Sequence, residues 1–196
     1  LGERRTVRQY HWGGGTPTYL TPEETREVQG RVLEHFTIAD DAEVAIEVDP
    51  RVTTGEHLDV LREVGFNRLS MGVQDFTLEV QEAVNRVRIF EQTAALVEHG
   101  RKLGFESVNI DLIYGLPAQT EGSFRDTVRT VISELAPDRV ACFSYAHVPW
   151  IKPHQKQLDQ ARMATGWEKF RLFVAAVEEF CAAGYRFIGF DHFARP

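Results

Sequence analysis

Three consecutive glycines stand between a run of β-branched and aromatic residues and a predicted helix start. The run covers residues 7–12, the glycines are Gly13, Gly14 and Gly15, and Thr21-Pro22-Glu23-Glu24 reads as a capping box with proline at the first helical position. A ligand can approach glycine backbone closely because no side chain intervenes. We predict a ligand-binding loop at the carboxyl end of a strand; a glycine-rich turn without a ligand is the alternative.

Polar residues also follow the other predicted strands. They are, in chain order, Glu47 and Asp49, Gln74 and Asp75, Asp111, Tyr145 and His147, and Asp191 and His192. Single residues of this kind are commonly helix caps or loop residues. In a parallel α/β fold, however, the carboxyl ends of the strands meet at one edge, and we expect these residues to face a shared site there.

These side chains suit a ligand that carries hydroxyls, an amine and a carboxylate. Asp111 and Glu47 can accept hydrogen bonds from ribose hydroxyls or an ammonium group, and Gln74 can both donate and accept. Arg86 can pair with a carboxylate. The sequence has no Gly-x-Gly-x-x-Gly, P-loop lysine or Gly-x-Ser-x-Gly, which disfavours dinucleotide binding, triphosphate binding and serine hydrolase chemistry.

A repeated pattern indicates the elements that position these residues. A helix, a glycine, an aromatic residue and a strand recur around Gly65-Phe66, Gly104-Phe105 and Gly184-Tyr185, and glycine just past a helix accepts the left-handed conformation that ends it. Further strands are predicted at residues 7–12, 43–48 and 139–145, and a second capping box at 53–56. Alternating strands and helices predict a parallel sheet: a partial βα barrel, with a doubly wound open sheet left open.

Composition indicates a soluble, cytoplasmic domain. The 196 residues are enough for one domain, which we place at 1–196, and no apolar run is long enough to span a bilayer. The net charge of −7 argues against a nucleic-acid surface. Cys142 and Cys181 are predicted to be buried core thiols, so we expect neither a disulfide nor a metal site from this chain's own residues.

Six motifs give the chain a resemblance to the oxygen-independent coproporphyrinogen III dehydrogenases of the radical S-adenosylmethionine (SAM) superfamily. The motifs are His11-Trp12-Gly13-Gly14-Gly15-Thr16-Pro17-Thr18-Tyr19-Leu20, Ile46-Glu47-Val48-Asp49-Pro50, Gly65-Phe66-Asn67-Arg68-Leu69-Ser70-Met71-Gly72-Val73-Gln74-Asp75-Phe76, Asn109-Ile110-Asp111-Leu112-Ile113-Tyr114-Gly115-Leu116-Pro117, Tyr145-Ala146-His147-Val148-Pro149 and Asp191-His192-Phe193-Ala194-Arg195-Pro196. The resemblance covers essentially the whole chain. The last two motifs distinguish the dehydrogenases from haem-binding relatives.

The resemblance implies a partial βα barrel that binds SAM and a 4Fe-4S cluster. In such enzymes a 5′-deoxyadenosyl radical takes a hydrogen atom from a propionate of coproporphyrinogen III, and loss of carbon dioxide and one electron leaves a vinyl group. Two propionates react, giving protoporphyrinogen IX. An electron donor and an electron acceptor are implied partners.

The resemblance also implies site residues. Gly14, Gly15 and Thr16 would contact the methionine end of SAM, and Arg86 its carboxylate. Gln74 and Asp111 would bind the ribose hydroxyls, Glu47 would line the pocket, and Ala146 would lie near the adenine. The catalytic residues stay unassigned. Arginines at the rim, including Arg51, Arg68 and Arg195, are candidates for the substrate's carboxylates, with solvated salt bridges as the alternative.

The chain departs from the family at both ends. The family's first strand, its cluster-binding three-cysteine loop and its C-terminal helical region are absent from these residues, so we expect a truncated domain that is inactive alone. Two other functions stay open. One is a haem- or porphyrin-binding carrier that uses His147 or His192, and the other is a cluster-free remnant.

Overall fold

The computed structural model describes residues 4–196, in which strands and helices alternate as predicted. The strands are β1 (Arg5–Trp12), β2 (Phe36–Val48), β3 (Arg68–Gln74), β4 (Ser107–Tyr114), β5 (Arg139–Ser144), β6 (Arg186–Gly189) and β7 (His192–Ala194). The α-helices are α1 (Pro22–His35), α2 (Gly55–Glu63), α3 (Leu78–Ala83), α4 (Phe90–Lys102), α5 (Glu121–Thr130) and α6 (Gly166–Ala182). Short helical turns are η1 (Pro17–Tyr19), η2 (Val131–Leu135), η3 (Pro153–Gln157) and η4 (Gln160–Arg162).

The sheet is mixed, which corrects the prediction of a wholly parallel one. Its strand order is β1-β2-β3-β4-β5-β7-β6, and β1 with β2 and β2 with β3 are parallel pairs. Strand β7, which the sequence did not predict, is antiparallel to both β5 and β6. A two-residue turn at Phe190 and Asp191, both with positive φ, joins β6 to β7, as in the hairpin turns that match strand twist.

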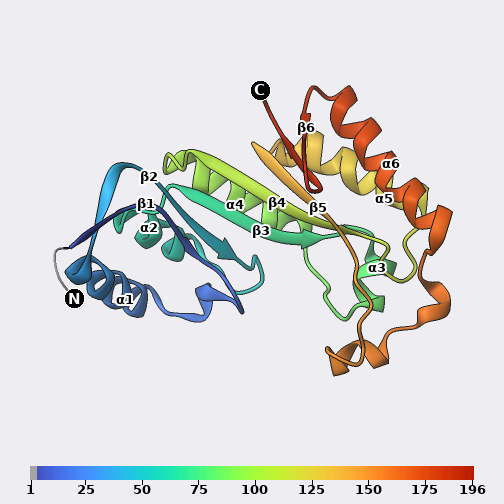
Figure 1. Ribbon diagram of the computed structural model, residues 1–196, viewed down its shortest axis with the longest axis horizontal. Coiled ribbons are helices and arrows are strands. Elements are labelled where there is room, and N and C mark those ends of the chain that lie inside the picture. Colours follow the sequence, from blue (N-terminus) through green and yellow to red (C-terminus); the bar gives the residue numbers. More distant parts are fainter. Residues whose placement is uncertain (1–3) are drawn as a thin grey trace. The chain divides into compact units, whose positions relative to one another are not determined.

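The chain forms two compact units, and β3 and β4 each contribute to both. The first unit comprises residues 1–72 and 91–109. In it α1 and α2 lie together beside β1 and β2, and Arg26 of α1 pairs with Glu63 of α2 (Figure 1). The buried face of β2 (Ala42, Val44, Ile46, Val48) alternates with a more exposed face, which carries Glu47.

The second unit comprises residues 73–90 and 110–196. Helices α5 and α6 pack side by side (Figure 1), and the glutamate Glu179 of α6 accepts hydrogen bonds from Arg125 and Arg129 of α5. The apolar residues Phe124, Val128, Val131 and Leu135 of α5 and η2 are buried. The packing of these two helices therefore combines an apolar interior with an ionic surface.

All three predicted glycine stops are confirmed. Gly65, Gly104 and Gly184 have φ values of +101°, +78° and +87°. The aromatic residue after each glycine donates its backbone N–H to a carbonyl in the last turn of the preceding helix, at 2.9–3.1 Å. This pattern of hydrogen bonds is the one that closes helices at a left-handed glycine.

Two local predictions need correction. The second helix is capped one residue later than predicted: Thr54 is the N-cap, and His57 replaces the expected acidic residue as its capping-box partner. Cys142 is buried as predicted, but Cys181 is exposed. It follows the buried Phe180 in α6, and one residue along a helix turns the side chain by about 100°, onto the outer face.

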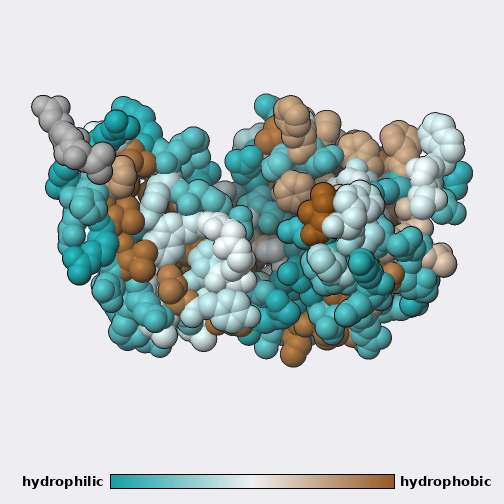
Figure 2. Space-filling model, turned by 60° about the horizontal axis from the view of Figure 1, so that its bottom comes forward, coloured by the Kyte–Doolittle hydropathy of each residue, from teal (hydrophilic) through white to brown (hydrophobic). Residues whose placement is uncertain are grey.

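Hydrophilic residues dominate the face seen in Figure 2, and hydrophobic residues form separate patches on it. Some large apolar side chains are well exposed, such as Phe190 at 95%. Within residues 4–196, no helix is both long and apolar enough to cross a membrane.

Candidate cofactor site

The predicted cofactor-binding residues divide between the two units. Gly14, Gly15, Thr16 and Glu47 belong to the first unit, and Gln74, Arg86, Asp111 and Ala146 belong to the second. Each set is described within its own unit.

The glycine loop follows β1 directly, as predicted. Gly14 and Gly15 have φ values of +81° and +67°, and no heavy atom lies within 4 Å of a Cβ built on either residue. Thr16 is extended, and its carbonyl accepts the N–H of Tyr19 at 3.1 Å. The backbone of both glycines is therefore exposed, and its positive φ angles are unfavourable for most other residue types.

Glu47 holds this loop from β2. Its Oε2 accepts the N–H of Gly14 at 3.3 Å, and its Oε1 lies 3.3 Å from Nε2 of His11. A Cβ on Gly13 would lie only 2.7 Å from that imidazole nitrogen and 2.8 Å from Glu47 Oε1. The structure thus gives Glu47 a partner that the sequence did not assign, and it explains why Gly13 has no side chain.

Gln74 ends β3 in an unusual backbone conformation. Its φ is +68°, and the N–H of Asp75 donates to the carbonyl of Val73 at 3.0 Å, so residues 73–75 form a γ-turn. The Oε1 atom of Gln74 is buried and has no hydrogen-bond partner within residues 4–196. A buried amide oxygen without a partner is costly, and such atoms in proteins call for a ligand, a water or strain as their explanation.

Arg86 and Asp111 differ in how they are presented. Arg86 is exposed, follows the left-handed Asn85 (φ +52°), and makes no ion pair among the described residues. Its backbone N–H donates to the carbonyl of Gln81 at 2.8 Å. Asp111 lies within β4, on the half-buried face that alternates with the buried Ile110 and Leu112.

The segment after β5 is fixed by two side chains. Nε2 of Gln155 donates to the Ala146 carbonyl at 3.0 Å, and its Oε1 accepts the Val148 N–H at 2.5 Å. Nζ of Lys169 donates to the Tyr145 carbonyl at 2.6 Å, and partial burial lowers the pKa of this lysine. The backbone around Ala146 is therefore held in place without using the Ala146 N–H.

The other polar residues predicted at strand ends have structural partners in their own units. Asp75 is 1% exposed, and His147 Nε2 lies 2.8 Å from Gln160 Nε2. Asp191 sits in the β6–β7 turn, where its carbonyl accepts the Cys142 N–H, and His192 begins β7. Asp191 and His192 therefore belong to a hairpin and not to the end of a parallel strand.

Each of the three arginines predicted to bind substrate carboxylates has a hydrogen-bond partner within the chain. The Arg51 guanidinium donates three hydrogen bonds to the Asp49 carboxylate, and these bonds raise the pKa of the guanidinium. Arg68 pairs with Glu43 at 2.8 Å, and Arg195 donates to the Tyr185 hydroxyl at 3.2 Å. Arg51 and Arg68 therefore form salt bridges, which was the alternative to a substrate contact.

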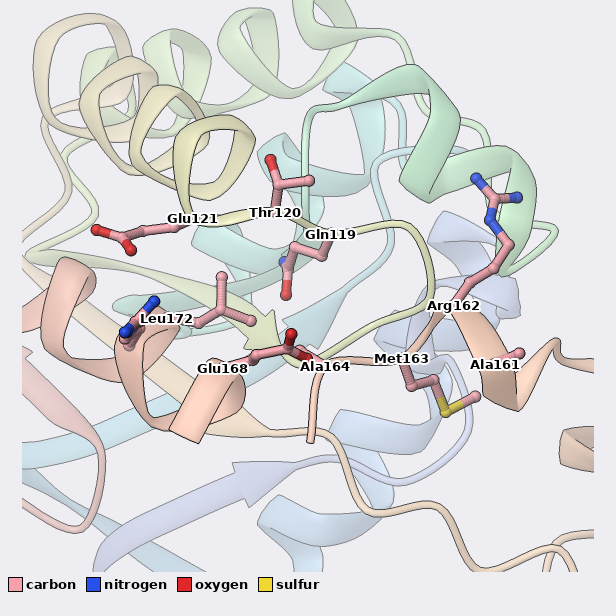
Figure 3. Close-up of a pocket in the computed structure, with 10 residues that line it drawn as sticks. Gln119, Thr120, Glu121, Ala161, Arg162, Met163, Ala164, Glu168 and Leu172 are labelled. Carbon is pink, nitrogen blue, oxygen red and sulfur yellow. The ribbon is translucent and has the colours of Figure 1, made fainter. Parts of the chain in front are cut away.

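A cavity of about 330 Å³ opens in the second unit (Figure 3). Its walls come from the start of α5, the segment around η4, and α6. Figure 3 shows Gln119 and Thr120 on one side and Glu168 and Leu172 on another. It contains none of the eight predicted residues.

The described residues offer no ligand set for a metal. Within residues 4–196, no group of three or more His, Cys, Asp or Glu side chains could hold a metal ion. Burial raises the pKa of the Cys142 thiol, which keeps it protonated. These residues do not fit an iron–sulfur cluster, because cluster ligands are thiolates.

Sequence reasoning missed four buried or half-buried polar residues that shape the second unit: Gln119, Thr127, Gln155 and Lys169. Gln119 lies in an irregular segment, Gln155 lies in η3, and Thr127 and Lys169 lie within α-helices. No local motif marks them, because each has a partner at least seven residues away in sequence, beyond the reach of a cap or turn pattern.

The chain is similar to known proteins of one superfamily. The radical SAM superfamily profile matches residues 1–131. Oxygen-independent coproporphyrinogen III oxidases from Synechocystis sp. and Escherichia coli are 42% and 49% identical over 100% and 98% of this chain, and in each case the match covers 42% of the relative. The chain thus spans about two fifths of the length of these relatives.

The structural comparison agrees. The structure of coproporphyrinogen III oxidase (HemN) from Escherichia coli, a radical SAM enzyme, matches with a TM-score of 0.94 and 49% identity over 97% of this chain and 44% of that protein. This likeness decides between the two predicted architectures: the fold is an α/β partial barrel of the radical SAM type.

Proposed function

The chain belongs to the radical SAM superfamily, and from this premise we propose that it forms most of the SAM pocket of an oxygen-independent coproporphyrinogen III oxidase. The reaction would convert two propionates of coproporphyrinogen III to vinyl groups, giving protoporphyrinogen IX in haem biosynthesis. The single observation that carries this proposal is the 49% identity and 0.94 TM-score to the Escherichia coli enzyme.

The cofactors of the superfamily are SAM and a 4Fe-4S cluster. The described residues fit SAM, because they offer open glycine backbone, a buried and unpartnered amide oxygen and an unpaired guanidinium. They do not fit the cluster. We propose that residues 1–196 are one radical SAM domain and that the cluster's ligands come from outside this sequence.

We assign roles by the chemistry of each group. The exposed backbone of Gly14, Gly15 and Thr16 would contact the methionine end of SAM, with Glu47 fixing that loop. Arg86 would pair with the SAM carboxylate. The amide of Gln74 and the carboxylate of Asp111 would bind the ribose hydroxyls, and the backbone near Ala146 would contact the adenine.

SAM, when bound, supplies the radical that removes a hydrogen atom from a substrate propionate. The substrate then loses carbon dioxide and one electron, which leaves a carbon–carbon double bond. The residues of this chain would bind and orient SAM for that step, and an electron donor and an electron acceptor would be further partners. We also propose a cytoplasmic protein that binds neither nucleic acid nor a membrane.

The test uses the complete open reading frame that contains this sequence. The protein would be expressed and its cluster reconstituted without oxygen, then assayed with coproporphyrinogen III, SAM and a reductant. Vinyl product together with 5′-deoxyadenosine is the expected result, and Asp111→Ala should suppress both.

Production of 5′-deoxyadenosine without vinyl product would contradict the oxidase assignment. A haem spectrum with an axial histidine that disappears in His147→Ala or His192→Ala would then favour the carrier alternative. In the described residues His147 Nε2 faces Gln160 and His192 Nδ1 lies 2.5 Å from the Phe190 carbonyl, so iron would bind the other ring nitrogen of either histidine.

A further inference from the structure

Asp75 is a buried carboxylate next to Gln74, and its side chain accepts hydrogen bonds from three donors. Oδ1 accepts the Thr77 N–H at 2.6 Å and the Thr127 hydroxyl at 2.9 Å, and Oδ2 accepts Nε2 of Gln119 at 2.6 Å. Thr127 is 2% exposed and Gln119 is 5% exposed. Hydrogen bonds to a charged acceptor in a dry interior are strong and geometrically demanding.

The same residue is linked to the Arg86 segment. The Asp75 carbonyl accepts Nε2 of Gln81 at 2.9 Å. Gln81 in turn accepts the Arg86 N–H at its backbone carbonyl, at 2.8 Å, and the Arg88 N–H at Oε1, at 3.0 Å. Gln81, which is buried, therefore links the backbone N–H groups of Arg86 and Arg88 to the Asp75 carbonyl.

Gln119 makes a matching link to the end of β4. Its Oε1 accepts the Gly115 N–H at 2.6 Å, and its Nε2 donates to the Ile113 carbonyl at 2.9 Å as well as to Asp75. Ile113 lies two residues beyond Asp111, on the same face of the strand. The position of this strand end is therefore coupled to the Asp75 carboxylate.

We infer that Asp75 is a positioning residue for SAM binding: its carboxylate acts through Gln119 and the Thr77 N–H to set the backbone at Gln74 and Asp111, while its carbonyl is linked through Gln81 to the backbone at Arg86. This inference rests on the proposed function, because Gln74, Arg86 and Asp111 have their cofactor roles from it.

The γ-turn at Gln74 supplies the physical reason. A side-chain-bearing residue with φ of +68° is strained, and such strain persists only where the surroundings determine the conformation in several ways. Asp75 supplies three accepted side-chain bonds and one accepted backbone bond immediately after the turn. The network thereby keeps the Gln74 amide oriented before a ligand arrives, which lowers the ordering cost of binding.

Asp75→Asn tests the inference with little change in shape. Asparagine has one acceptor oxygen where aspartate has two, so in either orientation its NH₂ group faces a donor: Gln119 Nε2 on one side, or the Thr77 N–H on the other. We expect this variant of the full-length, cluster-reconstituted protein to bind SAM roughly tenfold to a hundredfold more weakly in equilibrium dialysis. Backbone hydrogen exchange in residues 73–77 of the SAM-free protein should also rise.

A double-mutant cycle separates positioning from general destabilisation. If Asp75 acts through Gln74, Asp75→Asn should weaken binding less in a Gln74→Ala background than in the wild type, by roughly threefold or more. Equal weakening in both backgrounds, or wild-type affinity in Asp75→Asn, would overturn the inference.

Thr127→Val provides a second route if Asp75→Asn does not fold. It removes the hydroxyl that donates to Asp75 and accepts the Phe76 N–H at 3.2 Å, so it loosens the same turn from its other side, and we expect the same weakening in smaller measure. The matched control is Thr93→Val, because Thr93 is fully buried in α4 and its hydroxyl has no partner within residues 4–196. Wild-type affinity in a folded Thr127→Val protein would overturn the inference.

The outcomes also distinguish this inference from the proposed function. If the wild type binds SAM and Asp75→Asn weakens binding but no vinyl product forms, the oxidase assignment fails and the positioning role stands. If the wild type forms product and Asp75→Asn retains full affinity, only the positioning role fails. If the wild type does not bind SAM at all, both are overturned.

Discussion

The loops after β1 and after β3 both follow parallel strands and both carry proposed cofactor contacts, yet they are held in opposite ways. A single half-exposed carboxylate, Glu47, holds the glycine loop through contacts of 3.3 Å. The buried carboxylate of Asp75 holds the γ-turn through bonds of 2.6–2.9 Å. The first loop relies on glycine to adopt its conformation, and the second imposes a strained conformation on a glutamine.

The glycine loop and the γ-turn therefore suit different kinds of ligand contact. Backbone contacts need little orientation beyond an open path, so a loop of glycines held by one weak partner is sufficient. A side-chain amide that must present its oxygen in one direction needs a rigid support. Substitutions of the carboxylates and of the strained backbone positions test this contrast.

Asp75→Ala should have the largest effect. It leaves the Thr77 N–H, the Thr127 hydroxyl and one Gln119 N–H without their acceptor in a buried site, so we expect a loss of about 3–5 kcal/mol in the free energy of unfolding. Urea unfolding of the full-length protein measures it. A loss below about 1 kcal/mol would show that the network is not a rigid support.

Glu179→Gln tests a carboxylate of intermediate exposure, 17% for the side chain. Hydrogen bonds from Arg129 and Arg125 lower the pKa of Glu179 in the folded protein, so its stabilisation is present above the unfolded pKa of about 4.3 and is lost as pH falls through the lower folded pKa. We expect the variant to be about 1–2 kcal/mol less stable at pH 7.

The difference between Glu179→Gln and the wild type should shrink in urea titrations below pH ~4. Glu178→Gln is the matched control, because the Glu178 side chain is 57% exposed and, within residues 4–196, forms an ion pair only with Arg125. A deficit for Glu179→Gln that does not depend on pH would contradict the assignment.

Gly14→Ala and Gln74→Gly form a reciprocal pair. Alanine at a φ of +81° should cost about 1–2 kcal/mol of stability although the space around it is open. Gln74→Gly relieves the strained φ and should leave stability unchanged or raise it by up to about 1 kcal/mol, while it weakens SAM binding. Thermal unfolding with and without SAM measures both, and a large loss of stability in Gln74→Gly would contradict the strain argument.

Glu47→Gln should have the smallest effect on folding. The side chain is about half exposed and its contacts are long, so we expect a change of less than ~0.5 kcal/mol in unfolding free energy. Its effect should instead be seen as faster hydrogen exchange at Gly14. A destabilisation comparable to that of Asp75→Ala would remove the contrast between the two loops.

Much of the framework was predictable from sequence. The capping box at Thr21 and Glu24, the glycine stops and the glycine loop are all found where predicted. The β6–β7 hairpin was missed because its turn, Phe190-Asp191, lacks the Asn-Gly or Asp-Gly pair that usually marks a two-residue turn. The identities of the proposed SAM contacts came from motif resemblance and remain predictions.

Residue type and spacing were sufficient to predict the elements whose interactions are local. A helix cap joins residues three apart, and a glycine stop joins residues within one or two turns, so neither needs a distant partner. The role of Asp75, which the sequence predicted to face a shared site at the strand ends, depends on tertiary contacts. Its partners Gln119 and Thr127 lie 44 and 52 residues further along the chain, and only the folding of the second unit makes them neighbours.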